Sequence, residues 1–127
     1  LENGADEIDL VEPFLGEVDH FAGNLMLLAA LAGAKGRRRM PVRIINPAYE
    51  IAFLHNRART FTGRPGDTIS VVALSSGVWL TCTGTRYKAK KLMVRRGETV
   101  GLRNRMTGSQ ARISVEGEAF VFHQFSK

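Results

Sequence analysis

The chain has 127 residues and a formal net charge of +6. That length suits one domain with its own hydrophobic core. Its single cysteine, Cys82, excludes an intramolecular disulfide, and its place in an alternating run favours a buried structural thiol over a reactive one. The most apolar stretch, residues 21–34, is shorter than the about 20 residues of a membrane span, and its acidic upstream flank is unlike that of a signal peptide. We expect no transmembrane segment and leave an upstream targeting segment open.

Charge divides the chain into two parts. Residues 1–36 hold seven acids and one base, whereas residues 37–127 hold 17 bases and five acids. We therefore predict an acidic arm plus an apolar helix over 1–36, followed by a basic β-domain over 37–127. The arm would fold back on the body or dock on a basic neighbour. A solvated surface of mixed charge is the simpler alternative.

A helix is predicted in the first part. Apolar residues over 14–32 recur at spacings of three and four, and Gly33 or Gly36 would end the helix. After Leu25 the pattern is apolar nearly all round, which is typical of a helix buried under its own sheet or in a partner.

From Met40 onwards the chain reads as short strands separated by glycines and small polar residues. This pattern predicts a mainly β, small antiparallel domain, sandwich- or barrel-like, of about seven or eight strands. We expect a loop at 56–58 and turns at 96–98, 106–109 and 116–118. The expected strands cover residues 42–45, 49–54, 68–74, 78–83, 92–94, 99–102, 111–115 and 119–122.

One short pattern occurs twice. Residues 64–71 and 95–102 both contain glycine, an acid and threonine, followed by alternating apolar residues. The pattern predicts a tight turn at glycine, with the acid bonding the local backbone, that opens a strand.

Residues 64–122 resemble the C-terminal SAF domain, a β-clip fold, of the FlgA family of flagellar P-ring assembly chaperones. The resemblance is carried by Gly66-Asp67-Thr68-Ile69, Ser76-Gly77-Val78-Trp79-Leu80, Thr83-Gly84-Thr85, Gly97-Glu98-Thr99-Val100, Arg103-Asn104 with Thr107-Gly108-Ser109, and residues 115–121. It implies a β-clip module that binds a partner subunit during assembly of an extracytoplasmic ring, in the periplasm.

No complete catalytic or metal-binding motif is visible. His20, His55 and His123 lie far apart and lack the spacing of a metal site. Asp67 and Glu98 follow turn glycines, so capping of the turns is favoured over a catalytic carboxylate pair. We therefore predict no catalysis and no cofactor.

Two alternatives to the FlgA-like chaperone stay open. An acidic arm, an apolar helix and a basic body would suit an oligomeric structural subunit of a virus particle, such as a capsid decoration, collar or tail protein, that assembles through its arm. A basic β-barrel with interleaved aromatic residues would suit a binder of single-stranded nucleic acid, although no recognisable binding motif is present.

The surface residues that we expect to contact a partner are basic residues, one amide and two helix leucines. A protein partner or self-association is favoured, and nucleic acid is possible. The stretch Gly36-Arg37-Arg38-Arg39 is interpreted first as a solvated linker. The predicted contact residues are Arg37, Arg38, Arg39, Arg86, Lys88, Arg95, Arg96, Arg103, Asn104, Leu25 and Leu28. The expected compartment depends on the hypothesis: it is the periplasm for a FlgA-like chaperone and the virion for a viral subunit.

Overall fold

The computed structural model describes residues 8–11, 17–32 and 42–126. They form one helix and eight strands in a mixed sheet, with a parallel β1–β2 pair and antiparallel pairs elsewhere. The elements are β1 (Ile8–Val11), α1 (Val18–Ala32), β2 (Val42–Ile45), β3 (Tyr49–Thr62), β4 (Thr68–Ala73), β5 (Gly77–Thr83), β6 (Ala89–Arg95), β7 (Asn104–Arg105) and β8 (Gln110–Gln124). The prediction of a mainly β fold with one helix is confirmed. The sheet does not close into a barrel, unlike the barrel-like domain that the sequence predicted.

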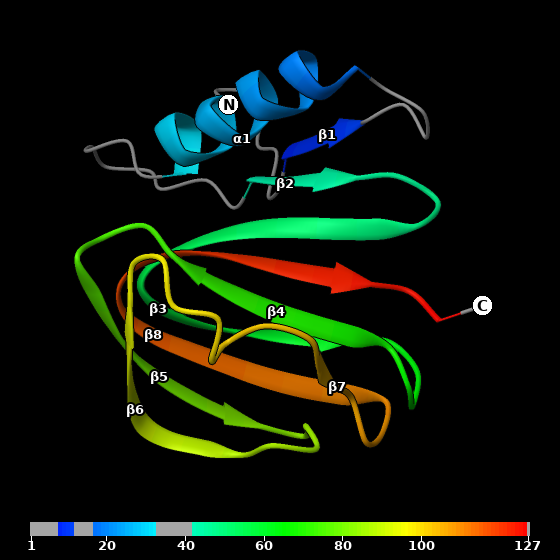
Figure 1. Cartoon of the computed structure of the whole chain (residues 1–127). Helices are drawn as coiled ribbons and strands as arrows, with labels where there is room; N and C mark the ends of the chain where they lie inside the picture. The colour runs from blue at the N-terminus through cyan, green and yellow to red at the C-terminus, as the bar shows by residue number, and fades with distance from the viewer. Residues whose placement is uncertain (1–7, 12–16, 33–41, 127) are drawn as a thin grey trace.

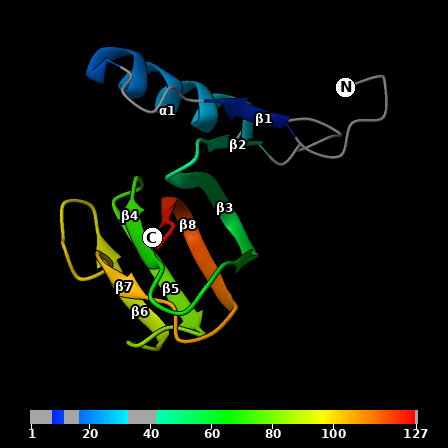
Figure 2. The same ribbon diagram turned by 90° about the vertical axis from the view of Figure 1, so that its right-hand side faces the viewer.

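The long strands β3 and β8 pair along almost their whole length and carry the rest of the fold. The second half of β8 also pairs with β4, and its first half pairs with β5. The sheet therefore folds over itself, with β5, β6 and β7 at one end and β1, β2 and α1 at the other (Figure 1, Figure 2).

Two apolar clusters follow from this arrangement. Inward-facing residues alternate along β4 and β5, so the main core lies between the folded halves of the sheet. A second cluster lies under α1, where Leu28 is fully buried against Ile44, Ile51 and Phe53. Burying a leucine side chain of this kind contributes roughly 1.5–3 kcal/mol.

The sequence predicted a loop and a turn at two places where the structure instead has one β-bulge between paired strands. The loop expected at 56–58 and the turn expected at 116–118 lie side by side within β3 and β8, whose register shifts between His55 and Arg57. Asn56 has a φ of 49° and Gly117 a φ of 117°, and the Gly117 N–H donates to Asn56 Oδ1 at 2.7 Å. Glycine with a positive φ occurs both in turns and in β-bulges, so the local sequence does not distinguish the two. The pairing with the neighbouring strand makes this site a bulge.

The repeated pattern is confirmed as a turn but not as a strand. Gly66 and Gly97 have φ values of 93° and 90°. Asp67 Oδ2 accepts the Arg64 N–H at 3.1 Å, and Glu98 Oε1 accepts the Arg95 N–H at 2.7 Å. The first turn opens β4, as predicted, whereas the strand predicted at 99–102 is wrong because these residues form further turns.

Helix α1 buries one face and exposes the other. Leu28 is inside and Leu25 is half-buried, but Met26, Leu27 and Leu31 are exposed. The predicted residues 14–16 and the glycines expected to end the helix lie outside the described residues. Within the part of the chain that the structure describes, no helix is long and apolar enough to cross a membrane.

Candidate functional site

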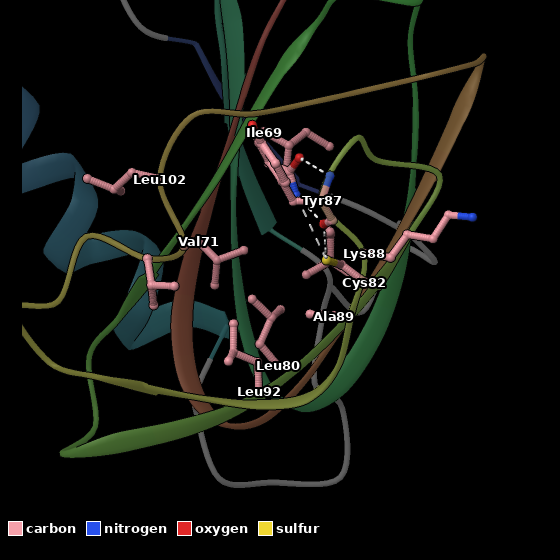
Figure 3. A pocket seen from close by; sticks show the side chains of 13 residues that line it. Ile69, Val71, Leu80, Cys82, Tyr87, Lys88, Ala89, Leu92 and Leu102 are labelled. Carbon is pink, nitrogen blue, oxygen red and sulfur yellow. Dashed lines mark hydrogen bonds between the residues drawn. The ribbon is translucent and has the colours of Figure 1, made fainter.

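A cavity of about 240 Å³ opens at the end of the fold away from α1. It lies between strands β4, β5, β6 and β8 and the segment before β7, and its lining is mostly apolar (Figure 3). We call this cavity the β4–β6 pocket. Its lining residues are Ile69, Val71, Leu80, Cys82, Tyr87, Lys88, Ala89, Leu92, Val100, Gly101, Leu102, Asn104 and Ile113.

Strand alternation makes the floor of the pocket. Ile69 and Val71 are two residues apart in β4, Leu80 and Cys82 are two apart in β5, and all four are buried. The same alternation that builds the main core therefore supplies the pocket floor. Cys82 is buried, as the sequence predicted.

The segment 99–103, which we call the strap, makes one wall. Gly101 accepts the Val71 N–H at 2.8 Å, and Ser70 Oγ accepts the Arg103 N–H at 2.8 Å. A Cβ at Gly101 would lie 2.5 Å from the Val71 carbonyl oxygen, so the close approach requires glycine. The strap thereby holds Val100 and Leu102, which are 56% and 40% exposed, at the opening of the pocket.

Asn104 fixes the opposite wall. Its Oδ1 accepts the Tyr87 N–H at 3.0 Å, and its Nδ2 donates to the Tyr87 carbonyl oxygen at 2.7 Å. Thr85 Oγ1 donates to the same carbonyl at 3.0 Å. The Asn104 side chain thus pairs with Tyr87 as a neighbouring strand would, across 17 residues of sequence.

The elements around the pocket carry a strong positive charge. Between residues 68 and 115 the chain has nine bases and one acid, Glu98. Glu98 Oε1 accepts the Arg95 N–H in the turn after β6. No carboxylate is among the described residues that line the pocket.

A second group of polar residues is buried outside the pocket. His123 is fully buried, with Nδ1 at 2.9 Å from Glu50 Oε2 and Nε2 at 2.7 Å from Asp67 Oδ2. We call these three residues the buried triad. Both ring nitrogens have carboxylate partners, so neither is available to bind a metal or to activate a nucleophile.

The triad perturbs the ionisation of all three members. Burial raises the pKa of Asp67, but hydrogen bonds from the Ser126 N–H, from His123 and from the Arg64 N–H outweigh it and lower the pKa to about 2. Burial opposes charge on Glu50 too, yet His123 and two arginines lower its pKa. Burial lowers the pKa of His123, whereas Glu50 and Asp67 raise it, and the net direction is upward.

One exposed group has metal-ligand character. Glu17, Asp19 and His20, at the start of α1, offer ligand atoms within 4.8 Å of one another. All three side chains are exposed, and exposed acidic groups of this kind are common without an ion. The pocket and the buried triad are the better-built features among the described residues.

The predicted contact residues fall into separate places. Lys88 and Asn104 line the pocket, and Arg86 and Arg103 flank it in sequence. Arg95 and Arg96 lie at the other end of β6, beside the turn before β5. Leu25 and Leu28 face the sheet under α1, and Arg37, Arg38 and Arg39 lie outside the described residues. Whether any of these contacts a partner stays a prediction.

Sequence reasoning missed the pocket and the triad. The sequence predicted a strand at 99–102, where the strap lies. Asp67 was correctly read as a turn cap, but its second partner, His123, is 56 residues away. Glu50 and His123 are directly paired across β3 and β8, so the strand register was the missing signal.

Comparison with known proteins identifies solved structures that share this fold. No family model and no curated protein matches the chain. Solved structures of thiamine pyrophosphokinases do match, at probability 1.00, over 98–99% of this chain. The chain therefore has the fold seen in the corresponding part of those enzymes.

The individual matches are distant in sequence but similar in structure. The thiamine pyrophosphokinase of Bacillus subtilis is 22% identical with a TM-score of 0.84, and 99% of this chain covers 59% of that one. That of Geobacillus thermodenitrificans is 22% identical with a TM-score of 0.79, and 99% of this chain covers 57% of that one. That of Candida albicans is 13% identical with a TM-score of 0.76, and 98% of this chain covers 48% of that one. The chain spans about half to three fifths of the length of these structures.

These matches correct the functional reading of the sequence. The resemblance to a FlgA-like SAF domain is wrong, because the whole described fold matches thiamine pyrophosphokinases instead. The predictions of a non-enzymatic assembly chaperone, of a virus-particle subunit and of a nucleic-acid-binding barrel are overturned by the same finding. The prediction of no catalysis is contradicted too, since the structures that share this fold are kinases.

Proposed function

We propose that this chain supplies the acceptor-binding pocket of a pyrophosphokinase, an enzyme that transfers a pyrophosphoryl group to a ring-containing alcohol such as thiamine. The observation that carries the proposal is the likeness to the Bacillus subtilis thiamine pyrophosphokinase, with a TM-score of 0.84 over 99% of this chain. Because the chain spans 59% of that structure, we assign to it only the part of the activity for which its own pocket is suited, which is binding of the acceptor.

The β4–β6 pocket is the place proposed for the acceptor ring. Small-molecule sites are concave and mostly apolar, with a few placed polar groups. This pocket has an apolar floor, a glycine-dependent strap and one amide, Asn104, at its wall. Its volume of about 240 Å³ is below that of most drug-sized sites, which favours a small ring compound or one ring of a larger one.

Isothermal titration calorimetry of thiamine into the full chain tests the proposal. Leu92, which lines the pocket and is 38% exposed, is replaced by arginine to fill the opening. Leu27→Arg, at an exposed leucine of α1 away from the pocket, is the matched control. We expect thiamine binding to be lost in Leu92→Arg and kept in Leu27→Arg. Equal binding to both variants, each with a native circular dichroism spectrum, would remove the pocket from the proposal.

A further inference from the structure

The charge around the pocket points to a more specific ligand class than the fold does. Among the described residues that line it, Lys88 has the only charged side chain. Its stem lies against the pocket, and its ammonium extends away from the labelled apolar side chains (Figure 3). The flanking residues Arg86 and Arg103 are cationic as well.

Two of these cations belong to a segment that is held in place. Asn104 and Thr85 bond the main chain of Tyr87, and the Arg86 N–H donates to the Arg105 carbonyl at 2.8 Å. The Arg86 guanidinium carbon lies over the Tyr87 ring, 5.4 Å from the ring centre, and the residue Tyr87 is 66% exposed. The rim therefore presents cationic groups beside an exposed aromatic residue. Because the main chain of this segment is already held in place, binding a ligand there costs less conformational entropy.

This rim is unfavourable for a cation and favourable for an anion. A ligand of net positive charge would meet no carboxylate among the described lining residues, whereas a diphosphate group makes the net charge of the same ring compound negative. An anionic group at the opening would meet Lys88, with Arg86 and Arg103 next in sequence, in a region of nine bases and one acid. Such a field also raises the local concentration of anions.

We propose that the β4–β6 pocket prefers a phosphorylated ring compound, with the ring in the apolar floor and the phosphate at the rim formed by Arg86, Tyr87 and Lys88. The inference rests on the proposed function, because it assigns a ligand class to the same pocket. Within that function, the chain would hold the phosphorylated product more tightly than the cationic acceptor.

Four probes separate the contributions of ring and anion: thiamine, thiamine monophosphate, thiamine diphosphate and inorganic diphosphate, each titrated calorimetrically into the full chain. We expect thiamine diphosphate to bind about tenfold more tightly than thiamine at low salt. Raising the ionic strength to about 0.5 M should remove most of that advantage, because exposed charges are screened. Inorganic diphosphate should bind more weakly than the diphosphate of the ring compound.

Charge-removing variants locate the effect. Lys88→Met keeps the length of the stem and should reduce the ratio of the two affinities, thiamine diphosphate over thiamine, severalfold. Arg112→Gln is the matched control, because Arg112 is exposed between the buried residues Ala111 and Ile113 and so faces away from the core. It should change neither affinity.

The outcomes are distinct. Equal affinities for thiamine and its diphosphate would overturn the inference and leave the proposed function standing. If Lys88→Met and Arg112→Gln reduce the preference for thiamine diphosphate equally, the inference is overturned too, because the effect would then come from the net charge of the protein and not from the rim. If inorganic diphosphate binds as tightly as thiamine diphosphate, the ring contributes no affinity, and the proposed position of the ring in the apolar floor is wrong. If neither thiamine nor its diphosphate binds, the proposed function fails and the inference fails with it.

Discussion

His123 Nε2 lies 2.7 Å from Asp67 Oδ2 in the interior of the protein, although 56 residues separate them in sequence. On its other side, His123 Nδ1 meets Glu50 Oε2, and Arg43 and Arg59 pair with the second oxygen of Glu50. Asp67 also accepts the Ser126 N–H at 2.7 Å. The triad thus ties strands β3 and β8, the turn before β4 and the C-terminal residues to one another.

Stability should fall on the alkaline side. The carboxylates raise the pKa of His123, so its imidazolium contributes stability that is fully present below the unfolded pKa of about 6.5. That contribution is lost as the pH rises through the higher folded pKa. We expect the melting temperature to fall as the pH rises from about 6.5 through that folded pKa, and His123→Gln to be less stable at pH 6 with a flatter profile. Thermal melts across pH check this, and an unchanged slope in His123→Gln would contradict it.

Asp67 should stabilise the protein through its ionised form. Its folded pKa of about 2 lies below the usual aspartate pKa of 3.8, so its contribution is present above about 3.8 and lost as the pH falls through about 2. Asp67→Asn should lower the free energy of unfolding by about 2 kcal/mol at pH 7. Urea titrations at pH 7 and pH 2.5 measure it, and the difference between the variant and the native chain should shrink at the lower pH.

The repeated turn provides a control for that variant. Glu98 caps the Arg95 N–H as Asp67 caps the Arg64 N–H, but Glu98 is exposed and has no histidine partner in any described contact. Glu98→Gln should change the free energy of unfolding by no more than about 0.5 kcal/mol. If Glu98→Gln lowers the free energy of unfolding as much as Asp67→Asn does, the stabilisation comes from the turn cap and not from the bond to His123.

Gly101→Ala should loosen the strap. The new Cβ would meet the Val71 carbonyl at 2.5 Å, so the strap must move away from β4. We expect a loss of about 1–3 kcal/mol in stability and weaker ligand binding. Gly108→Ala is the control, because a Cβ there meets nothing within 4 Å. Urea denaturation and calorimetry measure both effects, and equal behaviour of the two variants would mean that the strap does not depend on Gly101.

Leu28→Ala tests whether residues 1–36 form a part of the chain that folds separately, which stays a proposal. Leu28 is fully buried in the cluster under α1, so truncation should cost about 2–5 kcal/mol if that cluster unfolds with the body. Trp79 lies in β5, at the far end of the fold, and its fluorescence reports the body alone. We expect the Trp79-monitored midpoint to shift. The exposed Leu27→Ala is the control, and no shift for Leu28→Ala would support separate folding.

Local signals in the sequence predicted local structure well. Strand β2 was predicted at 42–45 as it stands, and the glycine turns at 66 and 97 have the expected positive φ. Errors arose where a distant partner decides the outcome. The Glu-Gly-Glu stretch at 116–118 is a bulge because Asn56 bonds Gly117 from another strand. The strap is held against β4 by contacts of Gly101 with Val71 and of Arg103 with Ser70, which the local pattern does not contain.

The functional reading failed for a related reason. The supposed SAF motifs are turn residues on a strand pattern, and turn chemistry recurs in unrelated β-folds. Of the pocket, sequence reasoning identified Lys88 and Asn104 as surface residues. The contact between Asn104 and Tyr87 could not be predicted, because nothing in the local pattern pairs residues 17 positions apart across a turn-rich segment.

The bulge at Asn56 and Gly117 has a mechanical consequence. Strands β3 and β8 extend from the half of the sheet covered by α1 to the half that contains the pocket, and the bulge lies between the two halves. A β-bulge bends its strand and increases the local twist. A change of curvature at this joint would tilt one half against the other. The two ends of the molecule thus share the same two long strands, and the bulge sets the angle between the sheet under α1 and the sheet around the pocket.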